Sequence, residues 1–164
     1  IMERRIVSGI TFSKDEAKLT LIGIKDKPGT AGLIFDCLSN ENINVDMIIQ
    51  NISEDGLTDV TFSCPTTQVE IAREALQRGK SGHTFNYSRL VEDKKVAKLS
   101  IVGIGMRSHS GVAQTMFKTL GQENINIKVI STSEIKISVL IDRKYLELAV
   151  QALHDAFELE KVPD

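Results

Sequence analysis

Tryptophan is absent from the 164-residue sequence, and aromatic residues make up only 5% of it. Platforms on which nucleic-acid bases could stack are therefore not evident. An excess of one charge is lacking too, because 20 Lys and Arg stand against 22 Asp and Glu, for a formal net charge of −2. Without a basic field we expect no nucleic acid among the partners.

Long apolar runs are also missing, and the longest span only a few residues, as at 47–49. A membrane-spanning helix needs about 18 or more consecutive apolar residues, so we expect no membrane partner. Residues 1–5 lead into no apolar core of the kind that a secretory signal carries. These absences together predict a cytoplasmic protein.

Motifs for metals, cofactors and catalysis are scarce. Cys37 and Cys64 have no CxxC or zinc spacing, so we interpret them as small buried hydrophobes, and the three histidines are too scattered for a metal site. Residues 103–105 read Gly-Ile-Gly, but Ser108 occupies the place of the third glycine of a dinucleotide fingerprint. The adjacent residues Ser108, His109 and Ser110 are typical of a loop, because the geometry of a triad comes from the fold. We expect no catalytic residue, no metal and no cofactor.

The sequence repeats itself. Glu-Asn-Ile-Asn at 41–44 recurs at 123–126, and the apolar run 21–24 matches 101–104. Further matches at constant spacing join Gly29, Ala31, Phe35 and Leu38 to Gly111, Ala113, Phe117 and Leu120. Each copy is therefore predicted to be one structural unit.

Hydrophobic periodicity assigns the order β-α-β-β-α to each copy. In the first copy the strands are expected at 19–24, 45–52, 60–64 and 84–91; the first helix contains the face Ala31, Ile34, Phe35 and Leu38, and the second begins at a capping box of Thr67 and Glu70. In the second copy, strands are expected at 127–132 and 137–141, with Asp142 capping the last helix.

The second copy lacks a fourth strand, whereas an apolar run at 6–12 lies outside both copies. We therefore expect residues 6–12 to close the second sheet, with the first unit inserted into the second. The predicted domains are 16–92, and 1–15 together with 96–164. The expected fold class is α+β, with two βαββαβ sandwiches whose antiparallel sheets carry helices on one face.

Both copies place a glycine-containing loop between the first strand and the first helix, at 25–31 and 105–113. Such a loop exposes unpaired backbone N–H groups at a helix N-terminus, which can hold a carboxylate. The alternative is an ordinary strand-to-helix turn that binds nothing.

Five segments carry a resemblance to a known family: Asp26-Lys27-Pro28-Gly29, 44–51 (Asn-Val-Asp-Met-Ile-Ile-Gln-Asn), 58–62 (Thr-Asp-Val-Thr-Phe), 105–111 (Gly-Met-Arg-Ser-His-Ser-Gly) and 130–138 (Ile-Ser-Thr-Ser-Glu-Ile-Lys-Ile-Ser). Over nearly its whole length the sequence resembles the tandem ACT-domain regulatory region of bacterial aspartokinases. The resemblance implies two ferredoxin-like ACT domains. The kinase region of the family is missing, so the chain resembles an excised fragment or a separately translated small beta subunit, with Met2 as its start.

The resemblance also implies a function. Aspartokinases use ATP to phosphorylate the side-chain carboxylate of aspartate, and lysine and threonine feed back on their ACT domains. The chain alone is then no enzyme, and its expected partners are lysine or threonine, the catalytic region or subunit of an aspartokinase, and a second copy in a homodimer. The alternatives are an ACT amino-acid sensor of another biosynthetic enzyme, against which residues 131–135 weigh, and a small α+β enzyme.

Two effector sites follow from the resemblance. The first comprises Asp26, Gly29, Thr30, Ala31 and Gln50, with Asn126 and Ile127 facing them. The second comprises Met106, His109, Gly111, Val112 and Ala113, with Asn44, Val45 and Asp46 opposite. We assign lysine to the second and threonine to the first, because Asp46 could compensate a cation whereas its counterpart in the other copy is Lys128. Thr30 and Ser110 depart from the residues common in relatives, which leaves the choice of effector open.

Overall fold

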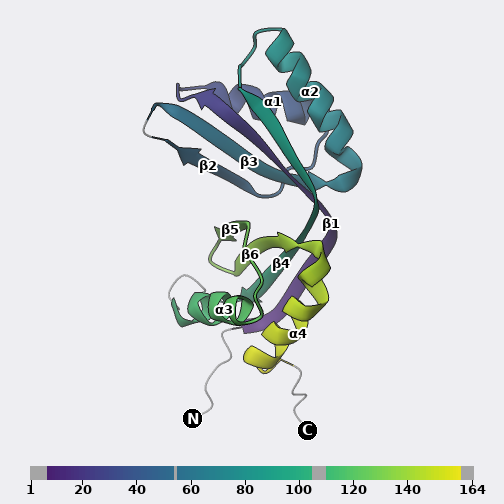
Figure 1. Cartoon of the computed structure of the whole chain (residues 1–164), viewed down its shortest axis with the longest axis vertical. Coiled ribbons are helices and arrows are strands. Elements are labelled where there is room, and N and C mark those ends of the chain that lie inside the picture. The colour runs from purple at the N-terminus through teal and green to yellow at the C-terminus, as the bar shows by residue number, and fades with distance from the viewer. Residues whose placement is uncertain (1–6, 54, 105–109, 160–164) are drawn as a thin grey trace. The chain divides into compact units, whose positions relative to one another are not determined.

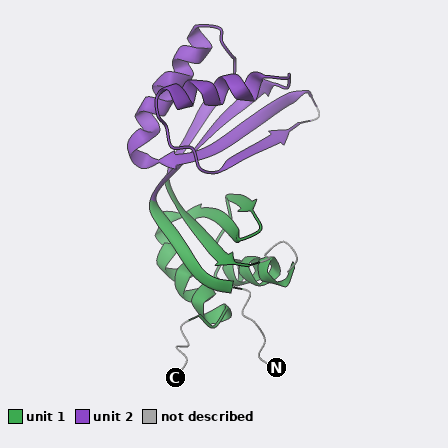
Figure 2. Ribbon diagram, turned by 180° about the vertical axis from the view of Figure 1, so that it is seen from behind, with its two compact units in different colours: residues 1–14, 95–164 green, residues 15–94 purple. Residues whose placement is uncertain are grey.

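A computed structural model describes residues 7–53, 55–104 and 110–159. The chain divides into two compact units (Figure 2). The inserted unit comprises Asp15–Lys94, and the split unit comprises Ile1–Lys14 with Lys95–Asp164. The boundaries differ slightly from those predicted: Asp15, expected in the split unit, belongs to the inserted unit together with residues 93 and 94, and Lys95 belongs to the split unit.

The inserted unit is a four-stranded antiparallel sheet with two helices on one face (Figure 1). Its elements are β1 (Val7–Lys25, from residue 15 onward), α1 (Thr30–Asn40), β2 (Ile48–Ile52), β3 (Leu57–Pro65), α2 (Val69–Ser81) and the first part of β4 (Arg89–Gly103). The strand order is β2-β3-β1-β4. Leu19 and Leu21 of β1 pack against Ile34, Phe62 and Leu76, all fully buried. Truncating one of these large core side chains to alanine costs about 2–5 kcal/mol.

The split unit repeats this arrangement with the order β1-β4-β6-β5. It contains β1 up to residue 14, the end of β4, α3 (Ser110–Gln122), β5 (Val129–Thr132), β6 (Lys136–Asp142) and α4 (Leu146–Ala156). Ser8 of β1 donates a hydrogen bond to the carbonyl of Val102 on β4, at 3.1 Å. Val7 lies in the apolar core between this sheet and its two helices. The α+β class and the tandem βαββαβ units are as predicted.

The strand expected at 6–12 and the one expected at 19–24 are parts of a single strand, β1. The polar stretch 13–16 between them stays extended, and Glu16 is paired with Pro65 of β3. Near its end β1 contains a bulge, because the register to β3 shifts between Leu21 and Ile24. Gly23 lies within it at a φ of 76°. A Cβ there would meet the Ser88 hydroxyl at 2.3 Å, so the position requires glycine.

The strand expected at 84–91 begins only at Arg89. The preceding segment is irregular, although Phe85 and Tyr87 are buried in it. Phe85 lies directly against Gly79 of α2, whose missing side chain leaves room for the ring. The apolar signal at 85–87 therefore reflects side chains that cover the end of α2 rather than a strand.

The predicted capping box at Thr67 and Glu70 is wrong, because a 3-10 turn (Thr66–Gln68) precedes α2 and no side chain caps the helix. The strand expected from Val45 begins at Ile48. Asn42 and Asn124 follow the ends of α1 and α3 and have φ values of 56° and 62°. Both therefore adopt the left-handed conformation that ends a helix.

Asp142 acts as a cap, but for the 3-10 turn Arg143–Tyr145 that precedes α4 rather than for α4 itself. Its carboxylate accepts a hydrogen bond from the N–H of Lys144 at 3.1 Å.

Candidate functional site

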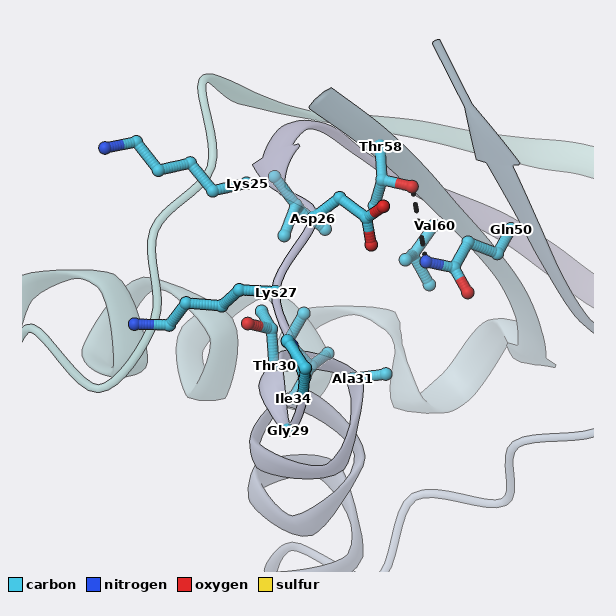
Figure 3. Close-up of a pocket in the computed structure, with 12 residues that line it drawn as sticks. Lys25, Asp26, Lys27, Gly29, Thr30, Ala31, Ile34, Gln50, Thr58 and Val60 are labelled. Atoms are coloured by element: carbon cyan, nitrogen blue, oxygen red, sulfur yellow. Dashed lines mark hydrogen bonds between the residues drawn. The ribbon is translucent and has the colours of Figure 1, made fainter. Parts of the chain in front are cut away.

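A cavity of about 410 Å³ lies in the inserted unit, where the loop of residues 26–29 connects β1 to α1 (Figure 3). It is surrounded by this loop and the start of α1, by the end of β1, and by the facing parts of β2 and β3. The lining residues are Ile24, Lys25, Asp26, Lys27, Pro28, Gly29, Thr30, Ala31, Ile34, Gln50, Thr58 and Val60.

The start of α1 supplies hydrogen-bond donors to this cavity. Gly29 is the N-cap residue, with a φ of 92°, and no side chain caps the helix. Its carbonyl accepts from the N–H of Leu33 at 3.1 Å, which closes the first turn. Of the preceding N–H groups, that of Thr30 donates to the carbonyl of Lys27 at 3.4 Å. Those of Ala31 and Gly32 have no partner within the helix, so this end of α1 can bind an anion.

A polar wall faces the helix start. The side-chain amide of Gln50 donates to the hydroxyl of Thr58 at 3.2 Å, and this hydroxyl donates to the carbonyl of Asn51 at 3.1 Å. Thr58 is only 3% exposed. The arrangement fixes the Gln50 side chain with its carbonyl oxygen left to accept a hydrogen bond from another donor.

The Asp26 carboxylate points into the cavity toward Gln50 and Thr58, whereas the side chains of Lys25 and Lys27 point away from it (Figure 3). The backbone fixes this orientation, because the N–H of Asp26 donates to the carbonyl of Gly56 at 3.1 Å. The loop therefore adds a negative charge to the polar wall.

The floor of the cavity is apolar and is formed by the buried side chains of Ile24, Ile34 and Val60. One side of the cavity thus offers N–H donors, the other offers a carboxylate and an amide oxygen, and the floor offers hydrocarbon. This combination suits a small zwitterion with a compact side chain.

The residues expected at the first site are brought together: Asp26, Gly29, Thr30, Ala31 and Gln50 all line the cavity. Asn126 and Ile127, expected to face them, belong to the split unit, where Ile127 packs against the core. Thr58 and the three apolar floor residues were not among the predicted site residues. Thr58 faces inward from β3, and the other residues on this face of the strand are apolar. A polar residue among apolar inward-facing residues could have indicated a role at the site.

The residues expected at the second site fall in three places. Met106 and His109 lie outside the described residues. Gly111, Val112 and Ala113 form the first turn of α3 in the split unit, and Val112 is buried in its core. The third group, Asn44, Val45 and Asp46, precedes β2 in the inserted unit.

In this third group, the N–H of Asn44 donates to the Gln68 side chain at 2.7 Å. The N–H of Asp46 donates to the carbonyl of Ser63 at 3.0 Å. Both contacts are structural, and they leave the exposed Asp46 carboxylate on the surface of the unit.

Among the described residues of the split unit, the pair formed by Gln50 and Thr58 is not repeated. Gln50 pairs with Val60, and Thr132 pairs with Ile137. Val60 and Ile137 are equivalent in the internal repeat, so Thr132 is the counterpart of Gln50. Ile135 is then the counterpart of Thr58, and it is 57% exposed rather than buried. The two copies therefore present different chemistry at equivalent positions.

The two cysteines are free thiols. Burial raises the pKa of Cys64 to about 11. Burial also raises the pKa of Cys37, whose thiol donates to the carbonyl of Ala75 at 3.1 Å. Among residues 7–53, 55–104 and 110–159, no three His, Cys, Asp or Glu side chains gather as a metal site. None of the helices in this part of the chain is long and apolar enough to cross a membrane.

The chain matches the model of an ACT domain family twice, over residues 19–79 and 99–157. An aspartate kinase of Pseudomonas fluorescens is 54% identical over 159 residues, which are 97% of this chain. The regulatory subunit of aspartate kinase from Thermus thermophilus, solved in a ligand-free form, is 36% identical with a TM-score of 0.86, and the match covers 93% of this chain and 99% of that one.

A solved structure of aspartokinase alpha and beta subunits contains a chain that is 47% identical, with a TM-score of 0.84 and 99% of its length covered. By contrast, this chain spans only 38% of the length of the Pseudomonas aspartate kinase. The matched portion of the longer proteins is thus the portion that stands alone as a regulatory subunit in the Thermus structure.

Proposed function

Because this chain belongs to the ACT-domain regulatory regions of the aspartokinases, we propose that it binds an amino-acid end product and thereby lowers the activity of an aspartate kinase. The observation that carries the proposal is the cavity at the start of α1. Its helix N–H groups and its Asp26–Gln50 wall match the two charged groups of an amino acid.

We place threonine in this cavity. Its α-carboxylate would accept hydrogen bonds from the N–H groups of the first turn of α1, and its α-ammonium would donate to Asp26 and to the side-chain carbonyl of Gln50. The short side chain would then lie on Ile24 and Val60, with its hydroxyl within reach of Thr58. A longer cationic side chain would lose hydration against this apolar floor, which disfavours lysine here.

We place lysine at the second site, at which Asp46 supplies a carboxylate. Asp46 and Lys128 occupy equivalent positions: the N–H of Asp46 donates to Ser63, and the N–H of Lys128 donates to Leu140, at 3.0 and 2.9 Å. The two copies thus differ by a charge reversal at one backbone position. A carboxylate favours a cationic effector, and an ammonium disfavours one.

The remaining parts of the proposal concern the assembly. We propose that the regulatory region is cytoplasmic and forms a homodimer. The homodimer is proposed because β2 and β5 are edge strands that carry the exposed apolar side chains of Ile48, Ile52 and Ile130. Unpaired edges of this kind favour strand-to-strand association. Its partner is the catalytic region or subunit of an aspartokinase.

Calorimetric titration of the full chain with threonine and with lysine tests the proposal. We expect Asp26→Asn to weaken threonine binding by roughly one to two decades, since a charge-assisted hydrogen bond contributes about 1.5–3 kcal/mol. Asp36→Asn is the matched control, because Asp36 lies on α1 but does not line this cavity. Its affinity for threonine should equal that of the unaltered chain.

The proposal is wrong if neither amino acid binds at millimolar concentration. The placement alone is wrong if threonine binds but Asp26→Asn leaves its affinity unchanged. Mixing the chain with an aspartokinase catalytic subunit and measuring aspartate-dependent ATP turnover tests the regulatory part. Threonine should lower turnover only when the regulatory chain is present.

A further inference from the structure

A second cavity, of about 670 Å³, lies on the other side of the β1–α1 loop, still within the inserted unit. It is bordered by the end of β1, by α1, and by the turn that follows α2. Its lining residues are Gly23, Ile24, Lys25, Lys27, Thr30, Leu33, Leu57, Lys80, His83, Thr84, Phe85, Asn86 and Ser88.

The charge of this cavity is of one sign. Lys25, Lys27 and Lys80 line it together with His83, and none of the described residues that line it is acidic. The acidic and basic side chains around the β1–α1 loop point in opposite directions: Asp26 points into the first cavity, whereas Lys25 and Lys27 point away from it (Figure 3). In a chain whose net charge is −2, this local excess of positive charge is a distinct feature.

Among the described residues, the three lysines Lys25, Lys27 and Lys80 form no ion pair with a carboxylate. Lys80 lies in the last turn of α2, where a cation is favoured by the helix dipole, and its ammonium lies 4.8 Å from the centre of the Tyr87 ring. Lys25 and Lys27 lie outside that helix, so the helix dipole does not account for the positions of their charges.

The rest of the lining is apolar and polar rather than charged. Phe85 is buried at the back of the cavity against Gly79, and Leu33, a large apolar residue of α1, is exposed at its side. Thr84, Asn86 and Ser88 contribute polar side chains. A ligand that fits must combine an anionic group for the lysines with an uncharged, partly apolar portion for Leu33 and Phe85.

We propose that this cavity binds an organic phosphate, with the phosphate or pyrophosphate group between Lys25, Lys27 and Lys80 and a ring portion against Leu33 and Phe85. Phosphate suits a cavity that several lysines line, because its several oxygens can accept hydrogen bonds from more than one ammonium. Each lysine is exposed and screened by solvent, but cations that line one concave site focus their field in it. The proposal is independent of amino-acid binding in the first cavity.

Titration of the full chain with ADP, pyrophosphate and adenosine, each alone, tests the proposal by calorimetry and by backbone amide NMR. We expect ADP to bind at submillimolar concentration, pyrophosphate about tenfold or more weakly, and adenosine not measurably. The amide signals of residues 83–88 should shift. Raising the salt concentration should weaken the binding of ADP.

Two variants localise the site. The double variant Lys25→Ala/Lys27→Ala should weaken ADP at least tenfold, and so should Lys80→Glu. Lys118→Ala is the control, because Lys118 is an exposed lysine of α3 in the split unit, and it should bind ADP as the unaltered chain does.

The proposal is overturned if ADP fails to bind at millimolar concentration. It is also overturned if both lysine variants bind ADP as tightly as the control does. Equal affinity for ADP and pyrophosphate would overturn the role of the apolar wall and identify the cavity as a site for inorganic polyphosphate. Far-UV circular dichroism of each variant separates a loss of binding from a loss of folding.

Discussion

The hydroxyl groups of Ser100 and Ser138 lie 2.7 Å apart on neighbouring strands, β4 and β6, and the two residues are 2% and 3% exposed. Thr20 and Thr61 form the same contact in the inserted unit, at 2.9 Å between β1 and β3. The four residues occupy equivalent positions of the internal repeat. The two copies have therefore kept a hydroxyl pair at the centre of each sheet while most neighbouring side chains have changed.

Replacing one hydroxyl of the buried pair should be more harmful than replacing both. Ser100→Ala removes the contact that Ser138 makes, and an unsatisfied buried hydroxyl costs about 1–3 kcal/mol of unfolding free energy. The double variant Ser100→Ala/Ser138→Ala should lose less than the sum of the single losses. Urea unfolding measures both quantities. Thr20→Ala is the comparison: its pair is partly exposed, so water can replace the missing hydroxyl, and an equal loss there would contradict the explanation.

Gly79→Ala should destabilise the inserted unit, because the added methyl group would lie 2.2 Å from a ring carbon of Phe85. Overpacking of this kind costs about 1–3 kcal/mol. Gly32→Ala, on α1, is the matched control. A Cβ at Gly32 meets nothing within 4 Å, so alanine should stabilise the helix by up to about 1 kcal/mol. Thermal unfolding of the two variants should therefore shift in opposite directions.

Acid should weaken the contact between α2 and β4. The guanidinium of Arg73 donates two hydrogen bonds to the carboxylate of Glu92, at 2.5 and 2.7 Å, and holds the pKa of Glu92 below its usual value. A lowered folded-state pKa stabilises the protein above the unfolded-state pKa, near 4.3, and this gain is lost as the pH falls through the folded-state value.

The side chains of Arg73 and Glu92 are 31% and 20% exposed, so we expect a loss of about 1 kcal/mol or less. The measurement is the unfolding free energy from pH 7 to pH 2. Glu92→Gln should be less stable than the unaltered chain at pH 7 and should approach it at the acid end. An undiminished difference at the acid end would show that the carboxylate charge is not the cause.

Asp46→Asn tests the charge reversal between the two copies. If Asp46 compensates the charge of lysine, the substitution should weaken lysine binding by roughly one to two decades and leave threonine nearly unchanged. The measurement is a calorimetric titration with each amino acid. Weakened threonine binding, or no change for either ligand, would reduce Asp46 to an ordinary surface charge.

The fold class was predictable because its signal is local and occurs twice. Apolar spacing identifies each helix, and the recurring Asn at 42 and 124 marks where the first helix of each copy ends. The element boundaries were less predictable because they depend on pairing. Residues 13–16 look like a linker in isolation, yet the ladder to β3 keeps Glu16 extended. Tertiary contacts of this kind override local preference.

The candidate site was likewise predictable only in part. Its loop residues were predictable, because a glycine before an apolar helix face marks a helix start with unpaired N–H groups. Thr58 was missed because its strand reads as core, and only its bond to Gln50 reveals a second role. The lysine-lined cavity could not be predicted either. Lys27 and Lys80 stand far apart in the sequence, and only the packing of the last turn of α2 places both on one cavity.

The insertion of one unit into the other sets an order of events during synthesis. Residues 7–14 leave the ribosome before the inserted unit does, but their partner on β4, which includes Val102, is made only after the whole inserted unit. At about 5–20 residues per second, that delay is roughly 4–16 s, long enough for the inserted unit to fold on the nascent chain. This segment therefore remains without its partner strand until the inserted unit has been made. Until then its apolar side chains that pack in the core of the split unit, Val7 and Ile10, are open to chaperones and to neighbouring nascent chains.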